Sequence, residues 1–154
     1  RVVDRFPHAK LAILGTGPPR LLEKLKAEIR MRNLEENIVF LGPIVRSEKY
    51  AILKASKVFV FPSYSESWAI AVSEAMYCGL TCVLYESKAY DAYLDGVIEI
   101  PPGMKIKFAE TLINVLSNDD LRRRIGDKAR CIASRFDWDR IALEHEQTLQ
   151  RIKD

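Results

Sequence analysis

Short apolar segments alternate with longer helical patterns along the first two thirds of the chain, and this alternation restricts its fold more than any other feature. The apolar segments lack a polar residue at every second position, so both faces of each predicted strand should be buried. Helices between such strands act as parallel crossovers. The pattern therefore predicts an α/β fold with an open parallel sheet and helices on both faces. The predicted strands are residues 10–14, 38–41, 58–61, 81–85 and 97–100.

The helical patterns carry their own boundary signals. Ser47 is a candidate N-cap, and Gly79 is a good C-terminal residue for the helix before it. After Gly103 the chain contains helical patterns alone, so we treat 105–154 as C-terminal helices of one domain that spans 1–154. The predicted helices are residues 20–31, 47–56, 69–78, 89–94, 105–116, 120–136 and 138–153.

Composition excludes several classes of protein. The chain has 154 residues, 48% of them hydrophobic and 29% charged, which is typical of one globular domain. Its net charge of +3 comes without aromatic-basic interleaving, so nucleic acid is not an expected partner. The basic run 122–124 is interpreted as a solvated helix face, with a peripheral membrane contact of the full-length protein as the alternative. The N-terminal residues show no signal peptide.

The cysteines and histidines favour neither disulfides nor a metal site. Cys78, Cys82 and Cys131 form an odd set without a CxxC pair, so we expect reduced thiols and a cytoplasmic location. His8 and His145 have no ligand-like neighbours, so no metal is expected.

Ligands of open parallel sheets lie beyond the carboxyl ends of the strands. The segments after the predicted strands, 15–20, 42–46, 62–68 and 86–91, are therefore the candidate binding loops. The first loop has two glycines, but Arg20 stands where the dinucleotide fingerprint G-x-G-x-x-G needs its third glycine. A nicotinamide enzyme is therefore disfavoured.

The most informative segment runs from residue 62 to residue 84. A buried strand leads into a polar loop with Glu66, and a helix starting near Trp68 carries Glu74. The first amides of that helix can bind an anion such as a pyrophosphate. Glu66 can alternatively serve only as a helix cap. Glu74 lies among apolar residues, so its carboxylate needs partners, which are either sugar hydroxyls or an internal Arg or Lys.

The spacing of Glu66 and Glu74 resembles the Glu-x7-Glu motif of glycosyltransferase family 4 and its GT-B relatives. The run EAMYCG at 74–79 is similar to that family's EAMACG stretch. Further along the chain, LAILGTGP at 11–18, NIVFLGPI at 37–44 and the FDW segment that begins at Phe136 match other family segments in the same order. The resemblance implies a Rossmann-like domain, the C-terminal, donor-binding domain of a GT-B glycosyltransferase.

The resemblance also implies roles for the residues of the central loop. Glu66 would contact hydroxyls of the donor sugar as the catalytic-site carboxylate, positioning the sugar, and Glu74 would hold the ribose of the nucleotide. The amides of the helix start would meet the pyrophosphate. The residues expected there are Ser67, Trp68, Ala69 and Ile70.

Residues that follow the first two predicted strands would complete the nucleotide site. The backbone near Pro43 and Ile44 would border the base. Gly15 and Gly17 would let the backbone approach the ligand closely, although a tight turn with positive φ explains them equally well.

The reaction implied is transfer of a hexose, such as mannose or glucose, from a nucleoside-diphosphate sugar to an acceptor hydroxyl with retention. Neither a metal nor a further cofactor is expected, and polysaccharide or glycolipid synthesis is the expected setting. The acceptor would bind an N-terminal domain that precedes this chain. The first strand of the donor-binding domain and the basic residues that clamp the pyrophosphate would also lie upstream of this chain. The chain alone is expected to be inactive.

The sequence departs from the family pattern at two places. Ser67, Trp68 and Ala69 replace Gly-Phe-Gly, and Asp91 stands near the position where the family has Glu. The altered loop supports an alternative, a non-catalytic GT-B-like module that binds a nucleotide or acts as a scaffold.

Overall fold

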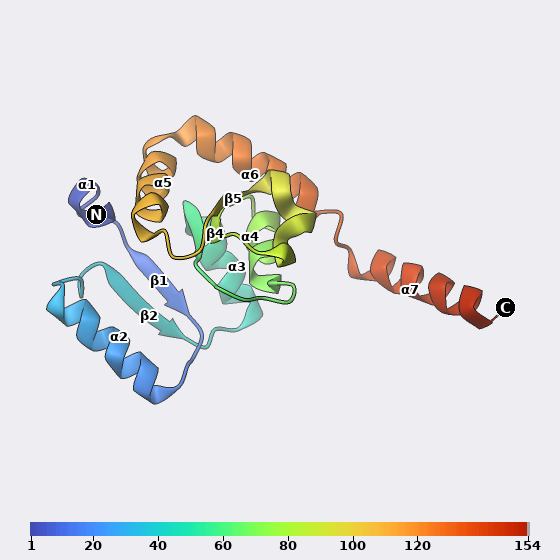
Figure 1. The fold of residues 1–154 in the computed structure, drawn as a ribbon, viewed down its shortest axis with the longest axis horizontal. Helices are drawn as coiled ribbons and strands as arrows, with labels where there is room; N and C mark the ends of the chain where they lie inside the picture. The colour runs from blue at the N-terminus through green and yellow to red at the C-terminus, as the bar shows by residue number, and fades with distance from the viewer. Residues whose placement is uncertain (154) are drawn as a thin grey trace.

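The computed structural model describes residues 1–153 and confirms the parallel α/β class (Figure 1). Strands alternate with helices up to residue 100, and helices alone follow. In chain order the elements are α1 Val2–Arg5, β1 Leu11–Leu14, α2 Pro19–Met31, β2 Ile38–Gly42, α3 Arg46–Ala55, β3 Val58–Phe61, α4 Ile70–Tyr77, β4 Thr81–Tyr85, the 3₁₀ helix η1 Lys88–Gly96, β5 Val97–Ile100, α5 Lys105–Ser117, α6 Asp119–Ala133 and α7 Trp138–Lys153.

The strands form two parallel sheets where the sequence predicted one. β1 pairs with β2, and separately β3 pairs with β4 and β4 with β5. β4 is thus the central strand of its sheet, with Cys82 beside Phe59 on one side and beside Val97 on the other. The predicted crossovers and strand directions hold, but apolar patterning alone does not specify which strands become neighbours.

Helices cover both faces of the β3–β4–β5 sheet. Cys82 and Leu84 face a cluster that includes residues of α4, η1 and α6, whereas Val83 and Tyr85 face a second cluster with residues of α5. All five residues of β4 are buried as a consequence. The apolar, non-alternating sequence of this strand is explained by contact on both sides.

The C-terminal end of α4 is determined by the residues that follow it. Gly79 adopts a φ of 79° and its N–H donates to the Met76 carbonyl, while the N–H of Leu80 donates to the Ala75 carbonyl. This is a Schellman motif, and it confirms the predicted role of Gly79.

The predicted N-cap Ser47 is wrong, because α3 begins at Arg46 and its N-cap is Val45.

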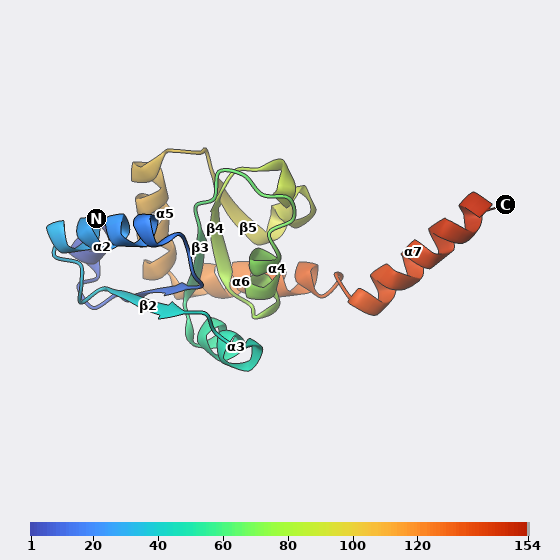
Figure 2. The ribbon, with the colours of Figure 1, turned by 90° about the horizontal axis from the view of Figure 1, so that it is seen from below.

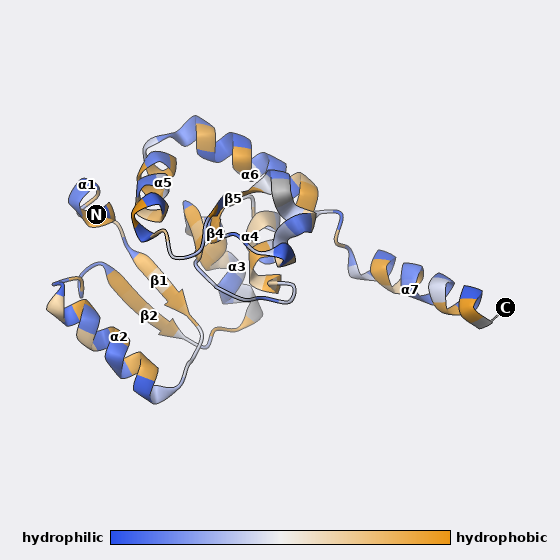
Figure 3. Cartoon of the chain, viewed as in Figure 1, coloured by the Kyte–Doolittle hydropathy of each residue, from blue (hydrophilic) through white to orange (hydrophobic). Residues whose placement is uncertain are grey.

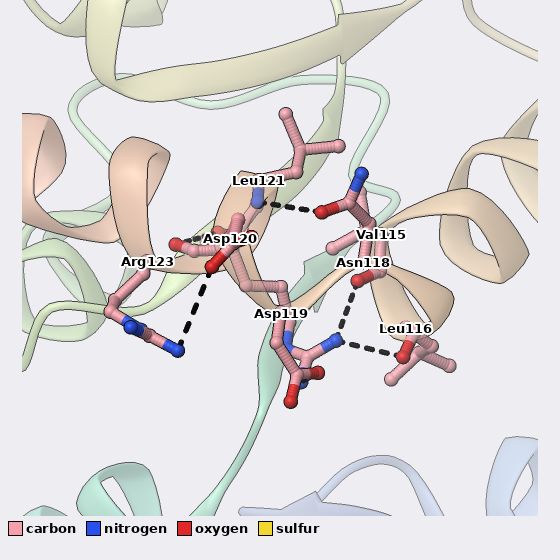
Figure 4. A network of polar contacts seen from close by, with 9 residues as sticks. Val115, Leu116, Asn118, Asp119, Asp120, Leu121 and Arg123 are labelled. Atoms are coloured by element: carbon pink, nitrogen blue, oxygen red, sulfur yellow. Dashed lines mark hydrogen bonds and ion pairs between the residues drawn. The ribbon is translucent and has the colours of Figure 1, made fainter.

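The joint between α5 and α6 is a polar network (Figure 4). Asn118 caps α6 by accepting from the Leu121 N–H at 2.9 Å. The guanidinium of Arg122 donates to the carbonyls of Val115 and Leu116, both at 2.7 Å, and also bonds Asp119. The predicted solvated face at 122–124 is therefore wrong for Arg122, whose side chain is 12% exposed and satisfies the last carbonyls of α5.

The last helix projects from the rest of the molecule. Figures 1 and 2 show α7 extending away from the domain after the short segment that follows α6. Large apolar side chains on it are exposed, among them Trp138 at 74% and Ile152 at 75%. None of the helices among residues 1–153 has the length and apolar character that crossing a membrane requires.

Candidate functional site at the carboxyl ends of the strands

The candidate binding loops gather at one edge of the β3–β4–β5 sheet because its strands are parallel. The loop with Glu66 follows β3, Glu86 follows β4, and Pro102 follows β5. The loops with Gly15 and Pro43 follow β1 and β2 in the same way in the other sheet. The fold therefore places the predicted loops where α/β proteins bind ligands.

The turn into α4 is held in a left-handed conformation. Ala69 has φ 52° and ψ 60°, is 7% exposed, and is the N-cap of a helix that begins at Ile70. A residue with a Cβ in this region costs about 1–2 kcal/mol. The resemblance places a family glycine at this position, so the backbone shape that glycine favours persists although the side chain has changed. The helix was predicted to start near Trp68, but it starts two residues later, at Ile70, so Trp68 lies in the loop before it.

Aromatic contacts fix the loop before α4. The Trp68 ring meets Tyr93 edge-on at 5.9 Å between centroids and Phe136 at 5.5 Å, and the Tyr93 and Phe136 rings lie 5.4 Å apart. The Tyr93 hydroxyl also donates to the Trp68 carbonyl at 3.3 Å. Two side chains far away in sequence thus hold the backbone next to the first turn of α4.

Glu66 is half-buried in this loop, and none of the described side chains forms a hydrogen bond with it. It lies near Tyr90, since burial first and then the charge of Glu66 raise the pKa of Tyr90 to about 12. The Tyr90 hydroxyl is buried and has no hydrogen-bond partner among the described residues. The local sequence around Glu66 does not indicate that Tyr90 lies near it, so the sequence analysis did not predict this neighbour.

Glu74 forms the shortest side-chain hydrogen bond of the candidate site. Its Oε1 accepts a hydrogen bond from Lys49 Nζ at 2.5 Å and another from Tyr50 Oη at 3.2 Å. The internal basic partner that the sequence left open therefore exists, and it is Lys49. The ion pair is not deeply buried, because the Lys49 side chain is 30% exposed and that of Glu74 is 21% exposed. Burial, followed by the Glu74 charge, raises the pKa of Tyr50.

The two glycines after β1 differ in their backbone requirements. Gly15 has a φ of 107° and its N–H donates to the Gly42 carbonyl at 2.7 Å, so the turn requires it. Gly17 does not have a positive φ. A Cβ built on Gly15 or Gly17 would meet no atom within 4 Å, which leaves open space beside this loop. Pro43 and Ile44 form the turn from β2 to α3, with Pro43 exposed and Ile44 half-buried.

An open hollow of about 480 Å³ lies at the carboxyl ends of β4 and β5. Glu99 on its wall accepts a bond from the Ser87 N–H at 3.4 Å. Burial raises the pKa of Glu99, and the charges of Glu86 and Asp91 add to this effect. The sequence anticipated part of this wall at 86–91 but missed Glu99. The lining residues are Glu86, Ser87, Lys88, Asp91, Glu99 and Pro102.

These features are those of a Rossmann-like parallel α/β domain of the GT-B fold. The model of the family "Glycosyl transferases group 1" matches residues 1–131. The chain therefore belongs to the group 1 glycosyltransferase family.

Relatives and solved structures agree with this assignment. The phosphatidyl-myo-inositol mannosyltransferase of Mycobacterium leprae is 30% identical over 147 residues, which are 93% of this chain and 38% of that protein. The D-inositol 3-phosphate glycosyltransferase of Corynebacterium jeikeium is 26% identical over 89% of this chain and 35% of its own length. The chain thus spans less than two fifths of the length of each of these two relatives.

Among solved structures, the sucrose-phosphate synthase of Thermosynechococcus elongatus has a TM-score of 0.88 at 21% identity, covering 98% of this chain and 40% of that one. The HepE protein of Anabaena, in complex with UDP and glucose, has a TM-score of 0.84 at 22% identity, covering 97% and 43%. At these identities the likeness shows the fold.

Proposed function

We propose that this chain is the donor-binding half of a retaining glycosyltransferase that transfers a hexose from a nucleoside-diphosphate sugar to an acceptor hydroxyl. Membership of the group 1 family supports transferase chemistry. The names of the relatives support a mannosyl or related hexosyl transfer, and the neighbour with bound UDP and glucose supports a nucleotide-sugar donor.

The observation that carries the proposal is the junction from β3 to α4. Ala69 precedes the helix in a left-handed conformation, and the amides of the first two helical residues, Ile70 and Ala71, have no preceding helical carbonyl to donate to, whereas the Val72 N–H donates to the Ala69 carbonyl. The partly exposed side chain of Glu74 follows in the next turn. Free amides at a helix N-terminus favour an anion, and a fixed carboxylate favours a pair of hydroxyls. A nucleoside diphosphate presents both groups.

In the proposed reaction, negative charge grows on the leaving diphosphate, and fixed dipoles stabilise it. The start of α4 supplies part of that stabilisation, and basic residues of an N-terminal domain supply the rest. Glu66 orients the donor sugar. The acceptor binds the N-terminal domain, and the reaction needs neither a metal nor a further cofactor. The proposed location is the cytoplasm.

A binding panel tests the proposal on the intact protein. UDP-, GDP- and ADP-sugars are added in turn, and the melting temperature is measured. One nucleotide class should stabilise the native state, by about 2.7 kcal/mol at about 100 times its Kd. Glu74→Gln should weaken that binding about tenfold or more. Glu110→Gln, an exposed carboxylate on α5, serves as the control and should leave affinity unchanged.

A transfer assay separates the enzyme from a non-catalytic module. With the donor identified above, turnover that persists in EDTA and gives a product with the donor's anomeric configuration supports the proposal. Binding without transfer to any hydroxyl acceptor favours the module. If no nucleotide sugar changes the melting temperature, the proposal is wrong.

A further inference from the structure

Two consecutive residues of α3 direct their polar groups at one atom of α4. Lys49 Nζ lies 2.5 Å and Tyr50 Oη 3.2 Å from Oε1 of Glu74. Among the side chains that the structure describes, none donates to Oε2 of the same carboxylate. Both contacts therefore fix one oxygen and leave the second to accept from another group.

Packing contacts restrict the side-chain conformations of both donors, Lys49 and Tyr50. Tyr50 packs against the apolar cluster that contains Leu53 and Val72. The ammonium of Lys49 lies 5.2 Å from the centre of the Tyr50 ring, within the range of a cation–π contact. A Glu side chain is flexible, and a ligand that has to order it loses affinity. Two anchored donors on Oε1 remove that cost before the ligand binds.

Charge gives the arrangement a second effect. An unpaired carboxylate beside the proposed anion site would repel a diphosphate. The ammonium of Lys49 cancels the charge of Glu74 through one carboxylate oxygen, and the Glu74 side chain stays 21% exposed. Within the described residues the other charged groups near Cys78, behind this pair, are Lys54 and Arg130. The pair can thus lie close to an anion while it accepts from a hydroxyl.

We infer that Lys49 and Tyr50 are positioning residues that hold Oε1 of Glu74 so that Oε2 accepts a hydrogen bond from a ribose hydroxyl of the ligand. The inference rests on the proposed nucleotide-sugar function and deepens it. Lys49 and Tyr50 act through Glu74, so their removal should weaken a ligand that offers that hydroxyl more than one that lacks it.

The test compares nucleoside diphosphates with their 2′,3′-dideoxy forms by titration calorimetry on the intact protein. Wild type should bind the ribose form of its preferred base about tenfold or more tightly than the dideoxy form. Lys49→Met should weaken the ribose form about tenfold more than the dideoxy form, because both diphosphates meet the uncompensated charge of Glu74 but only the ribose form also loses the oriented acceptor. Tyr50→Phe should give the same pattern with about a threefold loss.

Two controls make the result specific. Lys49→Arg keeps a cation that can reach Oε1, and it should restore most of the preference for ribose. Lys54→Met removes an exposed lysine of the same helix and should bind both ligand forms as wild type does. Tyr50→Phe deletes only a hydroxyl, so it keeps the test valid if Lys49→Met does not fold.

The outcomes distinguish this inference from the proposed function. Equal losses for ribose and dideoxy ligands in Lys49→Met and Tyr50→Phe, or no loss for either, overturn the inference while nucleotide binding by wild type sustains the proposed function. A wild type that binds the dideoxy form as well as the ribose form also overturns the inference alone. A wild type that binds none of the UDP, GDP and ADP forms overturns both.

Discussion

The β1–α2–β2 region and the region built around β4 share one plan, parallel strands joined by a helix, yet they differ in burial. Every residue of β4 is buried, whereas Leu11 and Leu14 of β1 are 43% and 37% exposed. Figure 3 shows that β1 and β2 are strongly apolar along their length. Among the described residues before Leu53, Ile29 is the one buried side chain.

The difference comes from the covering helices. The sheet around β4 has α5 on one face and α4 with α6 on the other, so its side chains are enclosed. α2 lies along one side of the β1–β2 pair (Figure 2). Apolar patterning thus specifies where a strand forms, and burial depends on which elements pack over it. The stability of the domain should be concentrated in the region around β4.

Truncation of matched leucines should give the largest contrast. Leu84 in β4 is fully buried, and Leu84→Ala should cost about 3 kcal/mol of unfolding free energy, because it leaves a cavity. Leu11→Ala removes the same atoms from an exposed strand and should cost less than about 1 kcal/mol. Urea denaturation measures both. Similar losses at the two sites would mean that the β1–β2 region is packed as tightly as the β4 region.

A matched pair of glycines should give the next effect. A Cβ on Gly126 would lie 2.1 Å from the Gly79 carbonyl oxygen, a backbone atom, where α6 approaches the end of α4. Gly126→Ala should cost about 2 kcal/mol even after the gain in helix propensity. Gly17→Ala meets no atom within 4 Å and should change stability by less than about 0.5 kcal/mol. Thermal denaturation measures both variants. An unchanged melting temperature in Gly126→Ala would mean that α6 can shift to accept the added methyl group.

Two buried tyrosines sharpen the description of the packed region. Tyr90 and Tyr93 are both 0% exposed, but only the Tyr93 hydroxyl has a hydrogen-bond partner among the described residues. Tyr90→Phe should therefore raise stability by about 1 kcal/mol, and Tyr93→Phe should lower it by about 1 kcal/mol. Opposite signs in chemical denaturation are the expected result. A loss in Tyr90→Phe would show that its hydroxyl has a partner, with Glu66, whose charge acts on Tyr90, as the first candidate.

The smallest effect should depend on pH at the rim of the packed region. Burial, with the charges of Glu86 and Asp91, raises the pKa of Glu99 in the folded protein. A raised carboxyl pKa favours the protonated native state, so the stability it contributes is complete below the unfolded pKa and is lost as pH rises through the folded pKa. Glu99→Gln should therefore gain stability relative to wild type as pH rises above the ordinary carboxyl pKa of 4.5, as melting temperatures would record. Glu110→Gln, which is exposed, should follow wild type.

Much of the candidate site could be predicted from local sequence. The spacing of Glu66 and Glu74 places one in the loop after β3 and the other in α4, and the structure has both there. Gly79 was predicted as a helix end because glycine tolerates a positive φ, and it has one. Each of these features depends on residues within a few positions of one another.

Other features of the site required the folded chain. Lys49 reaches Glu74 across 25 residues of sequence, and no pattern in α3 indicates it. Phe136 and Tyr93 hold Trp68 in the same indirect way. Ser47 was wrong as a cap because Val45 and Arg46 open the helix earlier. Such contacts depend on how the elements pack, which local propensity does not encode.

The sequence by itself determined the order of strands and helices, the loops at the carboxyl ends of the strands, and the family to which the ordered motifs belong. Local conformational preferences and apolar periodicity carry this information, because they act between near neighbours. Only the tertiary structure decided that the strands divide into two sheets, that β4 is enclosed while β1 is exposed, and that Lys49 and Tyr50 meet Glu74. Those outcomes depend on burial and on hydrogen bonds between distant segments, and they arise only when the whole chain packs together.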